Sequence, residues 1–346
     1  MRTALISILA FAAGVLVMLW LPLHRAASPG TAQPDSSAAA MASAGSSGPA
    51  PSSSADDDPG ENNDDDWPGN GPSPEQVMYA QPKMVADALA KLTPRVAGKT
   101  NLYLVTFAGD GGEDVFRNEA EYAAQLFPQR FGSTAHALVL ENNPDTLSSH
   151  PLASWSNLEA ALDGVAKVMN PDQDILMLYI TSHGDEDHNL LVDMDPLALD
   201  QISATDLGGI LAKRPFKWKV LVISACYSGG FVPPLHGSGT LVISAARTDR
   251  SSFGCGSDSD ATYFGKAWLV DALNRTPDFI AAFKQASAEI SQWEQHDKLT
   301  PSEPQIDIGS GIAGKLALWR KGFTAGPAVP FKPAAPAPAS TTALAQ

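Results

Sequence analysis

Short apolar runs alternate with amphipathic stretches through the middle of the chain. Runs rich in β-branched and aromatic residues predict strands over 102–108, 135–140, 174–181, 217–224 and 239–245. Apolar residues at helical spacing predict helices over 116–126, 158–169, 203–213, 262–273 and 279–293. Strands that alternate with helices over this length are typical of an α/β fold with a mostly parallel central sheet.

The start of the chain has a different pattern. Residues 4–23 are almost wholly apolar, and about 20 such residues span a bilayer. This predicts an N-terminal transmembrane anchor or signal segment over 1–25. Small residues at 26–28 offer a cleavage site, so an uncleaved anchor, which we favour, and a removed signal both stay open. We expect a single-pass protein of the cell membrane with its folded domain on the periplasmic or extracytoplasmic side. The alternative is secretion to the periplasm.

Composition divides the remainder into three parts. Residues 26–77 are rich in Ser, Ala and Pro and carry nine acidic and no basic residues, which predicts a disordered acidic tether. Residues 78–322 have the pattern of one folded domain, and the Pro- and Ala-rich residues 323–346 predict a disordered tail. The net charge of −15 argues against a nucleic-acid partner, although the tether holds more than half of it. Two cysteines exclude a disulfide-rich scaffold and a four-thiolate zinc site.

Candidate chemistry stands directly after two of the predicted strands. The strand over 174–181 runs into Ser182, His183 and Gly184, and the strand over 217–224 runs into Ala225 and Cys226. If the strands are parallel neighbours, the imidazole and the thiol emerge at one edge of the sheet, a few ångströms apart. An imidazole there takes the thiol proton and leaves a nucleophilic thiolate. The backbone N–H groups of Gly184 and Cys226 are candidates for an oxyanion hole.

These residues belong to motifs that resemble the legumain-type cysteine peptidases of the caspase-like clan, most closely their bacterial members. Thr-Ser-His-Gly-Asp occupies 181–185 and Ser-Ala-Cys-Tyr-Ser-Gly-Gly occupies 224–230, with 43 positions from His to Cys. Shorter similarities lie at 107–111, 115–117, 252–255, 262–265 and 302–306. The resemblance implies a caspase-like three-layer α/β/α domain that acts on peptide or protein substrates without a metal or an organic cofactor.

The resemblance also assigns roles. Cys226 would attack a peptide carbonyl to form a thioester acyl-enzyme, and His183 would be the general base or imidazolium partner. In this family a pocket binds the side chain before the scissile bond, often Asn or Asp. Arg117 resembles the pocket arginine, and Ser224 stands where an acidic pocket residue is usual. The resemblance thus implies substrate binding by Arg117 and Ser224 and cleavage after Asn or Asp.

Three departures from the family pattern change this expectation, and the first is Ser224 in place of the acidic pocket residue. Val115 stands in place of the asparagine that assists the catalytic pair, so the third catalytic residue stays unassigned. Asn118 replaces a second basic residue, which places the preference for Asn in question. Cys255 is expected to be structural, because a disulfide between it and Cys226 would block the nucleophile.

Two other functions stay open at this point. A zinc-dependent hydrolase would use His183, Asp185, Asp187 and His188, although the second His of the usual string is missing. A catalytically silent peptide-binding protein would keep the same fold. An α/β-hydrolase is disfavoured, because that fold places its catalytic His after the nucleophile. The acyl-enzyme could also pass to an amine instead of water, and the sequence does not specify the oligomeric state.

Overall fold

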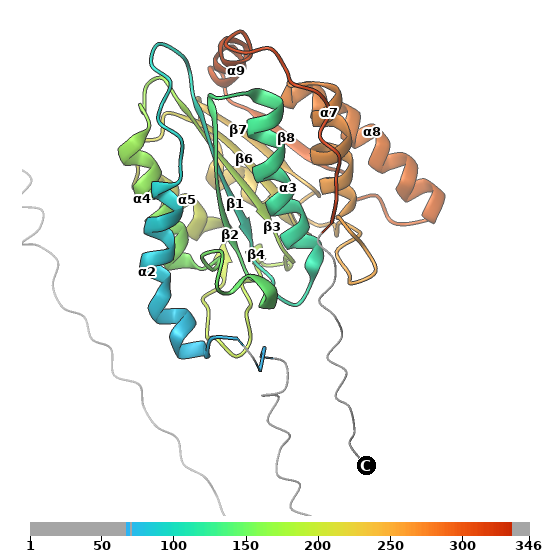
Figure 1. Ribbon diagram of the computed structural model, residues 1–346. Coiled ribbons are helices and arrows are strands. Elements are labelled where there is room, and N and C mark those ends of the chain that lie inside the picture. The colour runs from blue at the N-terminus through green and yellow to red at the C-terminus, as the bar shows by residue number, and fades with distance from the viewer. Residues whose placement is uncertain (1–66, 70, 334–346) are drawn as a thin grey trace, which may run out of the picture. The chain divides into compact units, whose positions relative to one another are not determined.

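The structure, a computed structural model, describes residues 67–69 and 71–333 (Figure 1). The predicted anchor over 1–25, most of the predicted tether and the end of the predicted tail lie outside these residues. Among the residues that are described, no helix combines the length and the apolar character needed to cross a membrane.

A six-stranded sheet forms the centre of the domain, in the order β2-β1-β3-β6-β7-β8. Its strands are β1 (Leu102–Ala108), β2 (Ala135–Glu141), β3 (Ile175–Thr181), β6 (Trp218–Ser224), β7 (Thr240–Ser244) and β8 (Gln305–Ile308). The first five strands in this order are parallel, and β8 pairs with β7 in the antiparallel sense. The five predicted strands are confirmed. The sixth was not predicted, because its four residues are only partly buried and carry no apolar run.

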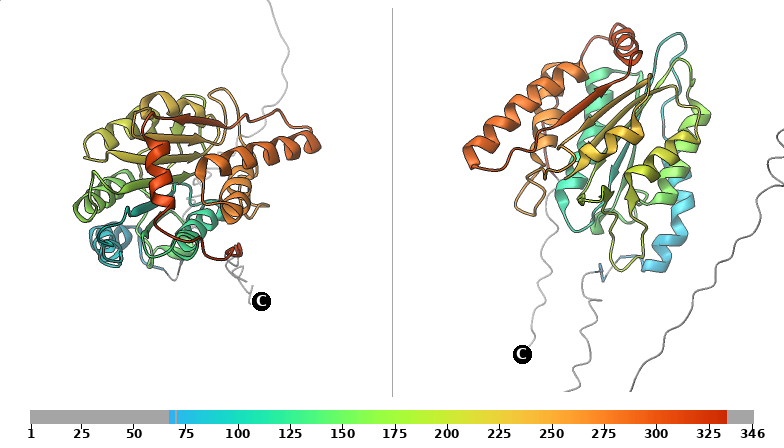
Figure 2. Two further views of the ribbon diagram at one scale, coloured as in Figure 1. Left: turned by 90° about the horizontal axis from the view of Figure 1, so that it is seen from above. Right: turned by 180° about the vertical axis from the view of Figure 1, so that it is seen from behind.

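Helices cover both faces of this sheet, as the views in Figure 2 show. The longer ones are α2 (Pro74–Ala90), α3 (Asp114–Phe131), α4 (Trp155–Val168), α5 (Ala204–Ala212), α8 (Phe279–Asp297) and α9 (Ile312–Arg320). The shorter elements are η1 (Pro144–Thr146), η2 (Ser228–Phe231), α6 (Val232–Leu235), η3 (Gly265–Ala272) and α7 (Leu273–Arg275), beside a small sheet of β4 (Asn189–Leu190) and β5 (Ile202–Ser203). One core cluster joins the sheet to α3, η3, α8 and α9, and a second joins its other face to α2, α4 and α5. The predicted three-layer α/β/α fold is confirmed.

Three elements differ from the sequence-based prediction. The segment predicted as a helix over 262–273 is π-helical in η3. Helix α2 begins at Pro74, before the expected domain start at residue 78, and Ser73 caps it. Part of the predicted tail packs on the domain, since Val329 is buried and its carbonyl accepts a hydrogen bond from the Tyr122 hydroxyl. Composition alone cannot predict these two ends, because a single cap or a single buried side chain decides each.

Candidate active site

Three neighbouring strands end at the same level of the sheet. The last residues of β1, β3 and β6 are register partners: Ala108 with Thr181, and Thr181 with Ser224. Two positions beyond these ends stand Asp110, His183 and Cys226. Parallel strands in register therefore deliver an acid, an imidazole and a thiol to one edge, where α/β sheets carry their functional groups.

The chain segments that follow β3 and β6 lie in close contact. The Ser182 N–H donates to the Ser224 carbonyl at 3.2 Å, and the next turn packs Gly184 directly against the carbonyl of Cys226. A Cβ at position 184 would collide with that carbonyl, so only glycine fits there. Within the described part of the chain, the N–H groups of Gly184 and Cys226 donate to no protein acceptor. Both are thus free to bind an anionic oxygen.

The Cys226 thiol lies in an environment that favours its thiolate. The Ser252 N–H donates to Sγ at 3.2 Å. A hydrogen bond with Cys255 lowers the pKa of Cys226 to about 6, helped by Ser252 and by the charge of nearby His183, although burial opposes the shift. The same contact, with burial, raises the pKa of Cys255. Of the two thiols, Cys226 is therefore the one that ionises near neutral pH, because Ser252 and His183 both act on it.

His183 is held by two groups that precede it in the sequence. Its Nε2 lies 3.4 Å from Oδ2 of Asp110, and the Phe116 ring packs edge-on against the imidazole at 5.1 Å. Asp110 is itself fixed, since its other oxygen accepts the Gly112 N–H at 2.8 Å and its side chain is 8 % exposed. With Nε2 directed at Asp110, Nδ1 is the nitrogen left for the thiol.

Asp110 is the functional residue that sequence reasoning missed. Val115, which replaces the family's assisting asparagine and left the third catalytic residue unassigned, is buried in a small core cluster with Phe116 and Ala120. The signal for Asp110 was present in the sequence, because it follows its strand at the same offset as His183 and Cys226 follow theirs.

A buried carboxyl supports this edge from below. Glu119 of α3 is fully buried and accepts hydrogen bonds from Tyr179, Thr181 and Thr262, each at 2.7 or 2.8 Å. Burial raises its pKa. These bonds tie α3 to the end of β3 and to the segment before η3. Glu119 thus fixes the strand end from which His183 emerges.

Arg117 lies behind a pocket wall. It is 2 % exposed, and its Nη1 donates to Asn143 at 2.8 Å and to Asp145 at 3.0 Å. Its Nη2 forms an ion pair with Asp114 at 3.0 Å. The single positive charge of the guanidinium is therefore paired with two carboxylates.

A pocket of about 240 Å³ adjoins this ion-pair network. Its lining comprises Gly111, Gly112, Glu113, Asp114, Asn143, Pro144, Asp145 and Ser257. Neither Arg117 nor Ser224 is part of this lining, and the Ser224 hydroxyl is buried against the Thr262 hydroxyl at 3.2 Å. The groups that face the pocket are thus acidic or amide side chains and backbone.

The four residues of the zinc alternative do not come together. Both ring nitrogens of His188 are engaged, with the Tyr227 carbonyl at 3.1 Å and the Thr248 hydroxyl at 3.2 Å. Asp185 accepts from the backbone and side chain of Asn189. In the described residues, the one group of three His, Cys, Asp or Glu side chains at ligand spacing lies elsewhere, around Glu141. The structure gives no support to a zinc hydrolase at His183.

Comparison with known proteins gives one family. The model of the peptidase C13 family matches residues 156–315, a segment that contains His183 and Cys226 but not Asp110 or Arg117. No curated protein matches the chain.

Proposed function

Because the chain is a legumain-like cysteine peptidase of the peptidase C13 family, we propose that it cleaves peptide bonds through nucleophilic attack by Cys226, with His183 as the group that moves the proton. The observation that supports this most is the strand register, which sets both residues two positions beyond the ends of paired strands. The lowered pKa of Cys226 supplies the thiolate.

The reaction follows from these positions. Cys226 Sγ bonds to the carbonyl carbon, and the oxygen takes up negative charge beside the N–H groups of Gly184 and Cys226. The C–N bond then breaks, and His183 gives its proton to the leaving amine. Water, deprotonated by His183, attacks the thioester carbon, and the acid product leaves with restoration of the thiolate. Throughout, Asp110 acts as a positioning residue that holds Nε2 and so directs Nδ1 at the reacting atoms.

We further propose that the pocket beside Gly112 binds the side chain before the scissile bond and prefers one that donates hydrogen bonds. Its lining includes the carboxyl groups of Glu113, Asp114 and Asp145, while Arg117 is covered. An Asn amide or a basic side chain gains hydrogen bonds there, whereas an Asp carboxylate meets like charge. Of the two residues that the family resemblance implies, the charge of this pocket favours Asn and disfavours Asp.

Cys-directed labelling tests the proposal. A peptidyl acyloxymethyl ketone with Asn before the reactive carbon should modify Cys226 at least 100-fold faster than Cys255, as measured by mass spectrometry of the full chain. Cys226→Ala should remove cleavage of a peptide library by at least 1000-fold. His296→Ala, at an exposed position of α8, is the matched control with unchanged activity. Equal labelling of the two thiols would instead indicate a silent peptide-binding protein.

A further inference from the structure

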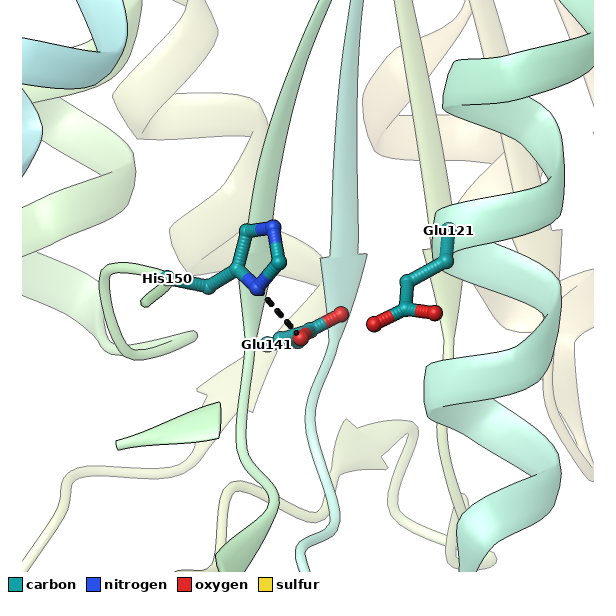
Figure 3. A group of neighbouring side chains, drawn as sticks. All are labelled: Glu121, Glu141 and His150. Carbon is teal, nitrogen blue, oxygen red and sulfur yellow. Dashed lines mark ion pairs between the residues drawn. The ribbon is translucent and has the colours of Figure 1, made fainter. Parts of the chain in front are cut away.

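A second group of ionisable side chains lies outside the active-site edge. Glu121 comes from α3, Glu141 is the last residue of β2, and His150 stands in the loop after η1. One ligand atom from each, a carboxylate oxygen or an imidazole nitrogen, lies within 4.8 Å of the other two. Figure 3 shows Glu121 and His150 directed toward the carboxylate of Glu141 from opposite sides.

Glu141 is the unusual member, because it is buried without the hydrogen bonds that burial demands. Its side chain is 0 % exposed, and within the described residues neither carboxylate oxygen accepts an aligned hydrogen bond. Its close contacts lie inside the group: an ion pair with Nδ1 of His150 at 2.9 Å and a side-chain contact with Glu121. Glu119, equally buried, is saturated by donors from Tyr179, Thr181 and Thr262. A buried carboxylate without donors needs a cation or a proton.

The charges around Glu141 favour a bound cation. The pKa of Glu121 is raised by burial and by the charge of Glu141. Close contact with Glu141 raises the pKa of His150, against burial and the positive charge of Lys91. Arg117, one turn before Glu121 in α3, acts on Glu121 but is already paired with Asp114 and Asp145. Two carboxylates therefore share one imidazole, which is neutral whenever it serves as a ligand.

We propose that Glu121, Glu141 and His150 bind a divalent transition-metal ion of the zinc class, with water in the remaining position. Two carboxylate oxygens and one imidazole nitrogen suit Zn²⁺, whereas Ca²⁺ and Mg²⁺ select oxygen ligands alone. Bonds of about 2.0–2.2 Å place ligand atoms roughly 3.4 Å apart. The 2.9 Å contact between His150 and Glu141 therefore lengthens slightly when the metal enters, and Glu121, whose ligand atom lies within 4.8 Å of theirs, moves closer. His150 also lines a cleft of about 270 Å³ together with Ser149 and Lys91.

The position suggests a structural rather than a catalytic ion. The ion would join α3, the end of β2 and the loop that returns from η1. Glu141 precedes by two residues Asn143, which binds the guanidinium of Arg117. The metal therefore holds together the two segments whose ion pairs form the pocket wall, and it is independent of the thiol chemistry.

Zinc titration of the full chain tests this site. The Cys226→Ala protein is used throughout, because a thiolate beside His183 would compete for the metal. After treatment with a chelator, isothermal titration calorimetry with Zn²⁺ should give one ion per chain, and saturating Zn²⁺ should raise the melting temperature. Glu141→Gln in this background should bind at least 100-fold more weakly and His150→Ala at least 10-fold more weakly. Neither should gain thermal stability from Zn²⁺.

One control and one further ligand variant make the result decisive. His296→Ala removes an exposed histidine outside the group and should bind Zn²⁺ like its parent. Glu121→Gln, at a half-buried position, tests the second carboxylate without disturbing the core. A parent protein that binds no Zn²⁺, or Glu141→Gln and His150→Ala proteins that bind it as tightly as the parent, would overturn the proposal.

Discussion

The active-site edge and the pocket wall are built by different means. At the edge, Asp110, His183 and Cys226 each follow a strand by two positions, so the sheet itself sets their spacing. At the wall, Arg117 comes from the first turn of α3, whereas Asn143 caps η1 and Asp145 lies within it. No shared sheet register fixes the geometry between these two segments. The pairing of charges fixes it.

This difference determines what a substitution does in each region. In the proposed mechanism, a polar group at the edge faces or positions a reacting atom, so its loss should lower the rate and leave the fold in place. A charge at the wall belongs to a network of ion pairs. Its loss should change the net charge that the pocket presents, and so the preference between charged and uncharged substrate side chains. The edge should therefore respond in kcat, and the wall should respond in the ratio between substrates.

The largest effect among the tests of this comparison is expected for Asp110→Asn. An amide at this position keeps the shape but no longer favours the Nε2–H tautomer of His183, because its NH₂ group can face the ring. We expect kcat to fall roughly 100-fold with KM nearly unchanged. Steady-state kinetics on a fluorogenic peptide would measure both parameters.

Asp110→Glu serves as the control for this test. It keeps the carboxylate and should recover part of the lost kcat, while the melting temperatures of both variants stay close to that of the parent. A loss confined to KM, or an equal loss in both variants, would show that Asp110 acts only in the fold.

The same contrast explains what the sequence could predict. Each of the five parallel strands carries its own apolar run, so each could be predicted from its local sequence. The positions of His183 and Cys226 then follow from the strand ends. The role of Asp110 was equally accessible, because it follows Ala108 at the same offset. It was missed because comparison with the family directed attention to Val115.

The pocket wall could not be predicted in this way. Arg117 was expected to face the substrate, and the structure buries it behind Asp114 and Asp145. Asp145 is 28 positions later in the chain and lies in the three-residue element η1, which is too short for periodicity to indicate direction. The group around Glu141 is of the same kind, since a helix, a strand end and a loop each supply one member.

An intermediate effect is expected for Asp145→Asn. This change removes one negative charge from the pocket and frees a donor of Arg117 Nη1. For peptides that differ only before the scissile bond, kcat/KM for Asp relative to Asn should rise about 10-fold, and kcat/KM for Lys relative to Asn should fall. Asp172→Asn, an exposed position at the far end of the sheet, is the matched control. Unchanged ratios would separate this pocket from substrate selection.

The smallest effect returns to the edge and concerns Cys255. Its hydrogen bond is the largest cause that brings the pKa of Cys226 to about 6. Cys255→Ala removes this bond, while Ser252 and His183 still favour the thiolate, so the pKa should rise by about one pH unit. Because the thiolate reacts, alkylation of Cys226 should slow several-fold below about pH 7 and stay nearly unchanged above about pH 9. The pH profile of iodoacetamide labelling measures this shift, with His296→Ala, at an exposed position of α8, as the control. An unshifted profile would assign the acidity of Cys226 to Ser252 and His183 alone.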